Sequence, residues 1–97
     1  MNLLGLTKIE YAKSLETLLV VALEQNSYAS EAAAEVILSL NNGPYWKLNL
    51  CSLSSLDSEN YLAAMKCIYG KKLFATEPQT LIKNASILLL KLKRKYT

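Results

Sequence analysis

The feature that most constrains this chain is a series of short amphipathic segments, each bounded by helix start and stop signals. Thr7 and Glu10 form a capping box, and Leu6 and Tyr11 are placed to form a hydrophobic staple around it. Apolar residues then recur at helical spacing, at Ile9, Ala12, Leu15, Leu19, Ala22 and Leu23. The pattern predicts a first helix from about Lys8 to Glu24.

A second segment carries the same kind of signal. Ser27 is placed to cap a helix whose inner face consists of Ala29, Ala33, Val36, Ile37 and Leu40. The sequence Asn41-Asn42-Gly43-Pro44 ends this helix, because Asn or Gly supplies the left-handed residue and proline cannot continue a helix. Asn49 then caps a short helical turn over residues 50–53.

Two further helices complete the pattern. Asp57 caps a helix from about Ser58 to Tyr69, which packs through Tyr61, Met65 and Ile68 and which Gly70 is expected to end. Residues 76–79 form a second capping box, and the last helix runs from there to about Lys95. Its core-facing stripe consists of Leu81, Ala85, Leu88, Leu89, Leu92 and Tyr96.

None of these helices is long enough to be stable alone, so they must share a core. A chain of 97 residues with 52% hydrophobic and 20% charged residues has room for one such core. We therefore expect an all-α fold, with residues 1–97 forming a single compact bundle of four main helices plus one short helical turn.

The chain also resembles a family. The residues that carry the resemblance are the run 15–22, Ala33, Val36, Ile37, Leu38, Asn41, Leu48, Leu50, Leu53, Leu56, Asp57, Pro78 and Leu81. In these it is similar to an uncharacterised family of small all-helical bacterial proteins, often carried on plasmids, phages and integrated elements. The resemblance implies a helical fold and a mobile-element origin. It implies no active site, because the family has no assigned activity.

Side chains for catalysis are scarce. The absence of histidine removes the usual general base, the Ser-His and Cys-His nucleophile arrangements and nearly all catalytic zinc sites. Cys51 and Cys67 lack metal-ligand spacing, and we expect reduced, buried thiols rather than a disulfide because small secreted domains usually carry more cysteines. Gly70-Lys71-Lys72 lacks the other residues of a phosphate-binding loop. We expect no enzyme, no metal and no cofactor.

The sequence also bears on location. No apolar run approaches the roughly 20 residues that a membrane crossing needs. Lys8 and Lys13 precede an apolar stretch over 15–23 that suggests a signal peptide, but Glu10 and Glu16 interrupt it, and the helix accounts for the same residues better. A cytoplasmic protein is the expectation.

Charge is divided unevenly along the chain. Through Met65, three lysines stand against seven acidic residues, whereas from Lys66 onward eight basic residues stand against Glu77 alone. A basic last turn complements a helix dipole, which explains part of this. The basic half predicts, as one alternative, a nucleic-acid surface made of Lys71, Lys72, Lys83, Lys91, Lys93, Arg94 and Lys95.

The last helix has a second apolar side. With its main stripe inward, Ile87 and Leu90 fall on the opposite face, among Lys83, Lys91 and Arg94. Two aliphatic residues framed by cations indicate a contact patch for a partner; burial against another part of the chain is the alternative.

At three other sites, apolar or aromatic residues either contact a partner or belong to the core of the chain. Val21 in the first helix and Leu38 in the second also lie off their main stripes, on faces expected to be exposed. Tyr45 and Trp46 follow a break, where they serve either as a binding anchor or as a plug for the end of the core.

These observations favour a non-catalytic regulator or inhibitor that binds another protein. One form of this hypothesis is a phage or mobile-element product that blocks a host or defence protein, in the manner of an anti-CRISPR. The alternative is an accessory protein that binds nucleic acid through the basic half. A homodimer, in which the patch meets its own copy, is a third hypothesis.

Overall fold

The computed structural model describes residues 5–41, 47–74 and 82–96. The helices are α1 (Lys8–Glu24), α2 (Tyr28–Asn41), the short 3-10 helix η1 (Leu50–Ser55), α3 (Ser58–Phe74) and α4 (Ala85–Lys95). Every regular element of the described residues is helical, which confirms the expected all-α bundle.

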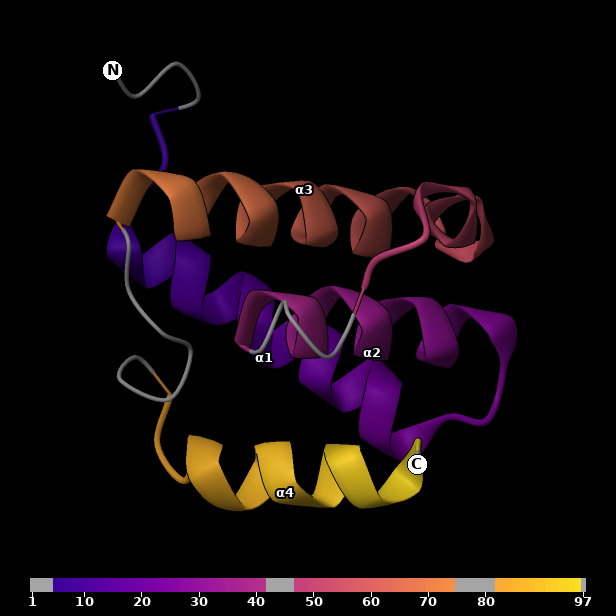
Figure 1. Ribbon diagram of the computed structural model, residues 1–97. Helices are drawn as coiled ribbons and strands as arrows, with labels where there is room; N and C mark the ends of the chain where they lie inside the picture. Colours follow the sequence, from indigo (N-terminus) through magenta and orange to yellow (C-terminus); the bar gives the residue numbers. More distant parts are fainter. Residues whose placement is uncertain (1–4, 42–46, 75–81, 97) are drawn as a thin grey trace.

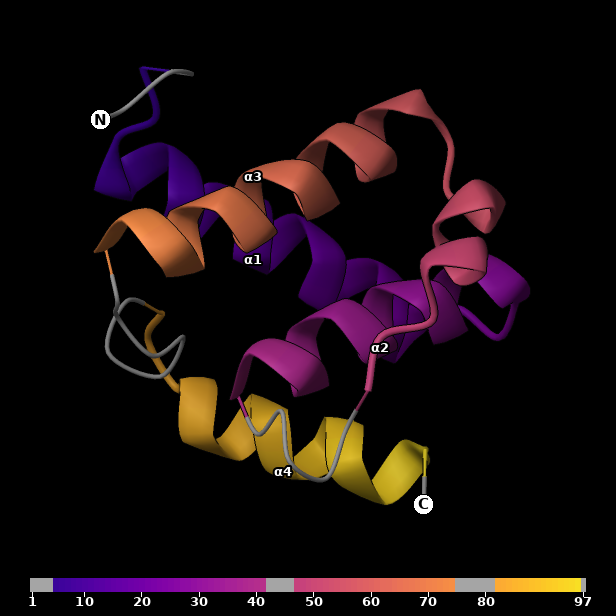
Figure 2. The same cartoon turned by 45° about the horizontal axis from the view of Figure 1, so that its top comes forward.

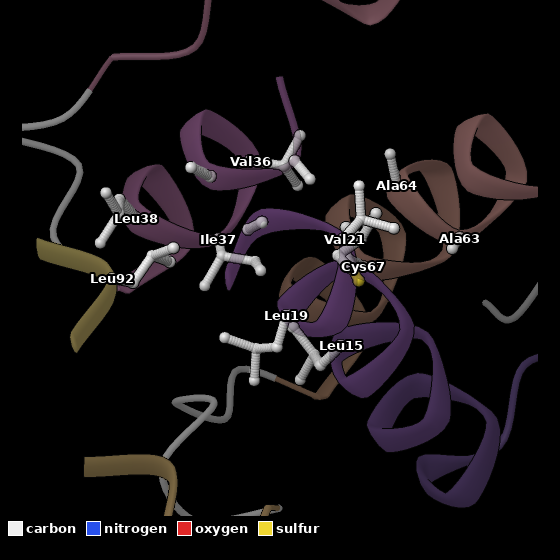
Figure 3. Close-up of a cluster of buried hydrophobic side chains, with 14 of the residues drawn as sticks. Leu15, Leu19, Val21, Val36, Ile37, Leu38, Ala63, Ala64, Cys67 and Leu92 are labelled. Atoms are coloured by element: carbon white, nitrogen blue, oxygen red, sulfur yellow. The ribbon is translucent and has the colours of Figure 1, made fainter. Parts of the chain in front are cut away.

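The helices are arranged around a central pair. α1 and α2 occupy the middle of the molecule, α3 lies on one side of them, and α4 lies on the opposite side (Figures 1 and 2). η1 packs against α2 and leads into α3. Side chains from α1, α2, α3 and α4 meet in one hydrophobic cluster (Figure 3). The central pair therefore contacts helices on both sides, whereas α3 and α4 each have an outward face.

α1 starts with Thr7 as its N-cap residue, which is the first half of the predicted capping box. The Thr7 hydroxyl oxygen accepts a hydrogen bond from the Glu10 backbone N–H at 3.1 Å and donates to Glu10 Oε1 at 3.2 Å. Leu6 and Tyr11, the two ends of the predicted staple, are both buried. Local sequence alone is enough to place this helix end, since each partner lies within a few residues of the others.

The inner faces of the central helices are wider than predicted. Val21 of α1 and Leu38 of α2, expected outside, are both buried, which corrects the assignment from periodicity. Conversely, Ile9 was assigned to the core stripe of α1 and is 69% exposed. Leu38 is buried because α2 packs against α1, η1, α3 and α4, so that a residue outside the main stripe of α2 still meets a neighbouring helix.

α3 does not end at Gly70, as predicted, but continues to Phe74. A Cβ atom at position 70 would lie 2.5 Å from Cδ1 of Tyr11, so Gly70 lets α3 approach the buried ring of α1 closely. The ring of Phe74 stacks on that of Tyr11, with centroids 5.8 Å apart. The glycine serves helix packing and not helix termination. Tyr61, predicted to pack inward, is exposed.

The predicted caps of η1 and α3 are present. Asn49 Oδ1 accepts a hydrogen bond from the Cys51 backbone N–H at 3.0 Å, and η1 extends to Ser55, two residues beyond the prediction. Asp57 Oδ1 accepts one from the Asn60 N–H at 2.8 Å at the start of α3. Asx side chains thus satisfy backbone donors at both helix starts.

α4 begins later than the sequence pattern indicates. Asn84 adopts a left-handed conformation, with φ at 62°, and the helix starts at Ala85. Its inner side is made by Ala85, Leu89 and Leu92, all buried, as predicted. The predicted capping box at 76–79 and Leu81, and the predicted stop at residues 42–44, lie outside the described residues.

Candidate protein-interaction surface

The α4 helix presents two aliphatic side chains to solvent. Ile87 is 58% exposed and Leu90 is 49% exposed, which confirms that they lie outside the core. Lys83, just before the helix, and Lys91 and Arg94 within it are exposed too. These five residues, here called the outer face, form an apolar pair framed by cations. Such a combination is typical of a contact surface, because single exposed apolar residues are common but framed pairs are less so.

The rotation of α4 about its axis is fixed from the opposite side. The Lys95 ammonium donates hydrogen bonds to the backbone oxygens of Ala22 at 2.7 Å, Leu23 at 3.3 Å and Gln25. The Tyr96 hydroxyl donates to the Ala22 oxygen at 3.0 Å. These bonds satisfy carbonyls at the end of α1, which has no basic residue of its own in its last turn. With this end held, Ile87 and Leu90 remain exposed on α4.

The charge of α4 has a single sign. The helix contains four basic residues and no acidic one. The Lys95 ammonium is hydrogen-bonded to backbone oxygens at the end of α1, and Lys93 is half-buried. Lys91 and Arg94, together with Lys83 before the helix, are therefore the exposed cations that a partner can reach. A surface of this kind attracts acidic groups and repels basic ones.

The predicted nucleic-acid set does not form one surface. Lys71 and Lys72 lie in the last turn of α3, on the other side of α1 and α2 from α4 (Figure 1). The ammonium of Lys95 faces the end of α1. Of the five predicted cations in or just before α4, Lys83, Lys91 and Arg94 are exposed, and Lys93 and Lys95 are half-buried.

A groove between α1 and the start of α4 adjoins the outer face. Its volume is about 330 Å³, and its apolar lining comes from Leu19, Val20, Leu23, Ile82 and Leu88. Leu88 of α4 lines the groove, and Lys91 of the outer face lies about one helical turn after it, so the two adjoin along α4. Sequence reasoning missed this groove because it depends on how two helices far apart in the chain converge. The only local signal was Val20, an apolar residue on the outer side of α1.

With this geometry in place, comparison with known proteins gives one match. The model of a family of unknown function, DUF7673, matches residues 12–87. The chain belongs to this family. No curated protein and no solved structure matches it. The family match runs from α1 into α4 and takes in Ile87, but it assigns no role to any residue.

A second exposed apolar pair of this DUF7673 chain lies on α3. Tyr61 and Leu62 are both exposed near the start of the helix. Met65 and Tyr69 lie further along and are half-buried against the core. Helical projection did not single out this face, because α3 carries apolar residues on nearly all sides. The mixed charges of Glu59 and Lys66 nearby favour no partner of either sign.

The loop aromatics and the two cysteines are the remaining residues that the sequence singles out. Tyr45 and Trp46 lie outside the described residues. Both cysteines are free thiols. Cys67 is buried, and burial raises the pKa of its thiol well above the ordinary value. Cys51, predicted to be buried, is exposed instead, because the first turn of η1 lies at the surface.

Within 5–41, 47–74 and 82–96, no three or more Cys, Asp or Glu side chains are grouped so that they could hold a metal ion. In the same part of the chain, no helix combines the length and apolar composition of a membrane-crossing segment.

Proposed function

We propose that this protein is a non-catalytic regulator that binds another protein through the outer face of α4. The observation that carries the proposal is the exposure of Ile87 and Leu90 inside a frame of cations. Aliphatic side chains at the centre of an interface exclude water and hold a complex together. The surrounding charges speed association and select partners of opposite sign.

A narrower form of the proposal is an inhibitor that acts by occupying a surface of its target. We propose a phage or mobile-element origin, an anti-CRISPR-like action on a host or defence protein, and a cytoplasmic location. Small size and the lack of histidine support a role in binding over one in chemistry.

Nucleic-acid binding is the second candidate, favoured by the exposed Lys83, Lys91 and Arg94. Against it, Lys71 and Lys72 lie away from these cations, and two aliphatic residues occupy the centre where phosphates would lie. A gel-shift titration at two salt concentrations tests it, because phosphate contacts weaken steeply as salt rises. No shift at low salt would eliminate this candidate.

Direct self-association of the outer face is disfavoured by its charge. A twofold contact between two copies would bring Lys83, Lys91 and Arg94 against the same three residues. Like charges placed across an interface cost binding energy. Light scattering at low and high protein concentration is expected to give the mass of a monomer at both.

The proposal is tested by affinity capture from lysate of the native host, treated with nuclease. The Ile87→Asp, Leu90→Asp double variant is expected to lose the protein that the wild type captures. The matched control is Ile9→Asp with Leu50→Asp, which changes two even more exposed aliphatic residues on α1 and η1 and should keep it. Equal capture by both double variants, with both folded by circular dichroism, contradicts the proposal.

A further inference from the structure

We infer that the α1–α4 groove and the outer face form one continuous site for an acidic segment of the partner protein that carries a single large apolar anchor. This inference rests on the proposed function and names the chemistry of its partner. The continuity comes from α4 itself, because Leu88 lines the groove, Lys91 lies about one helical turn after Leu88, and Ile87 lies one turn before Lys91. A segment with its anchor in the groove therefore passes directly over the cations of α4.

The groove is suited to one side chain. Its volume of about 330 Å³ is at the lower end of the range for small-molecule sites. Val20 is half exposed at its surface, and Leu23 and Leu88 are half-buried, so the lining is apolar and open to solvent. A large aliphatic or aromatic side chain would cover this lining. Burial of such an anchor removes apolar surface from water and so stabilises a complex.

The charges on the two sides of the groove determine where acidic residues of the bound segment lie relative to the anchor. The α1 wall of the groove carries Glu16 and Glu24, whereas the other wall carries Lys83. Lys91 and Arg94 extend the positive side along α4. Acidic residues of the bound segment are thus attracted towards α4 and repelled from α1, which fixes the orientation of the segment across the groove.

The same charges exclude other occupants. The outer face of a second copy would place its own cations on Lys83, Lys91 and Arg94. A nucleic acid would bring phosphates near Glu16 and Glu24 and would leave the apolar lining without an anchor. An acidic peptide segment matches both the charge and the apolar lining.

The test is a selection from a displayed library of random 16-residue peptides on the immobilised full chain. Selected peptides are expected to be rich in Asp and Glu around one Phe, Trp, Leu or Ile. The best of them is then synthesised with a fluorescent label, and its affinity is measured by anisotropy. Failure to select any peptide, or selection without an acidic bias, overturns the inference.

Filling the groove gives the second arm of the test. Val20→Trp is expected to weaken binding of the labelled peptide about tenfold or more, since the anchor loses its place. The control is Ile9→Trp, the same change at another exposed residue of α1, which should leave the affinity unchanged. Equal affinities for the two variants, both folded by circular dichroism, overturn the inference.

Charge reversal gives opposite effects on the two walls. Lys91→Glu with Arg94→Glu is expected to weaken the peptide about fivefold or more, and Glu16→Lys with Glu24→Lys to tighten it by about two- to fivefold. Changes in the same direction, or displacement of the peptide by an equimolar 20-base-pair DNA duplex, overturn the inference. If Val20→Trp still captures the cellular partner while Ile87→Asp, Leu90→Asp does not, the inference fails but the proposed function stands.

Discussion

α2 and α4 are both apolar on more than one side, but the second apolar side is buried in α2 and exposed in α4. In α2, Leu38 lies outside the main stripe and is 1% exposed. In α4, Leu90 lies outside the main stripe and is 49% exposed. α2 is in the middle of the molecule and meets α1, η1, α3 and α4, whereas, among the described helices, α4 makes its main contacts with α1 and α2 (Figure 1).

The difference shows that a second apolar side has no fixed meaning in a sequence. Both helices carry leucines that a projection at 100° per residue places on the outside. The number of neighbouring helices decides whether such a residue belongs to the core or to a surface. Of these two helices, α4 is the one whose second apolar side is exposed.

The comparison is tested most strongly by truncating the two leucines. Leu38→Ala is expected to lower the free energy of unfolding by about 2 to 5 kcal/mol, because it leaves a cavity in a packed core. Leu90→Ala should change it by less than about 0.5 kcal/mol. Urea unfolding followed by circular dichroism measures both. Similar losses for the two variants would show that α4 is covered on both sides.

The next effect concerns the contact of α3 with the central pair. Gly70→Ala is expected to cost about 2 kcal/mol, because the added methyl group meets the ring of Tyr11 although alanine favours a helix. In a Tyr11→Ala background the same change should be neutral or stabilising. Thermal unfolding of the four proteins in this cycle gives the coupling. A stabilising Gly70→Ala in the otherwise unchanged protein would contradict the close approach.

A smaller effect is expected where α4 is held against α1. Lys95→Met keeps much of the side-chain length but removes the hydrogen bonds to the end of α1, and should cost about 1.5 kcal/mol. Hydrogen exchange should become faster in α4 and the last turn of α1 and stay unchanged in α3. Unchanged exchange in α4 would indicate that its buried leucines alone hold it.

The smallest effect on stability is expected at the proposed docking surface. Ile87→Asp with Leu90→Asp should change the free energy of unfolding by less than about 1 kcal/mol in total, as for other surface substitutions. This insensitivity contrasts with the loss of partner capture expected from the same variant. A large loss of stability, measured by urea unfolding, would place the pair inside a contact within the monomer.

Sequence alone accounted for the local features of the fold. The capping box at Thr7 and the caps at Asn49 and Asp57 involve partners within three residues, so their hydrogen bonds can be read from spacing. For Ile87 and Leu90, helical projection predicts a position opposite the core stripe but leaves burial against another part of the chain as the alternative, and the structure shows that both are exposed.

The sequence does not show which helices pack against one another in the fold. A glycine at position 70 predicts a helix stop because glycine often ends helices, but the Tyr11 ring that Gly70 accommodates is 59 positions away in the chain. Val21 was assigned to the outside for the same lack of tertiary information. The groove beside Val20 depends likewise on Ile82 and Leu88, which only the fold brings close.

The bonds from Lys95 and Tyr96 to the end of α1 have a consequence for synthesis of the chain. Ala22 emerges from the ribosome long before Lys95, which lies 73 positions later. At about 5 to 20 residues per second, the interval is roughly 4 to 15 s. During this time the carbonyls of Ala22 and Leu23 have only water in place of Lys95 and Tyr96. The last turn of α1 therefore gains these hydrogen bonds only when α4 has been made.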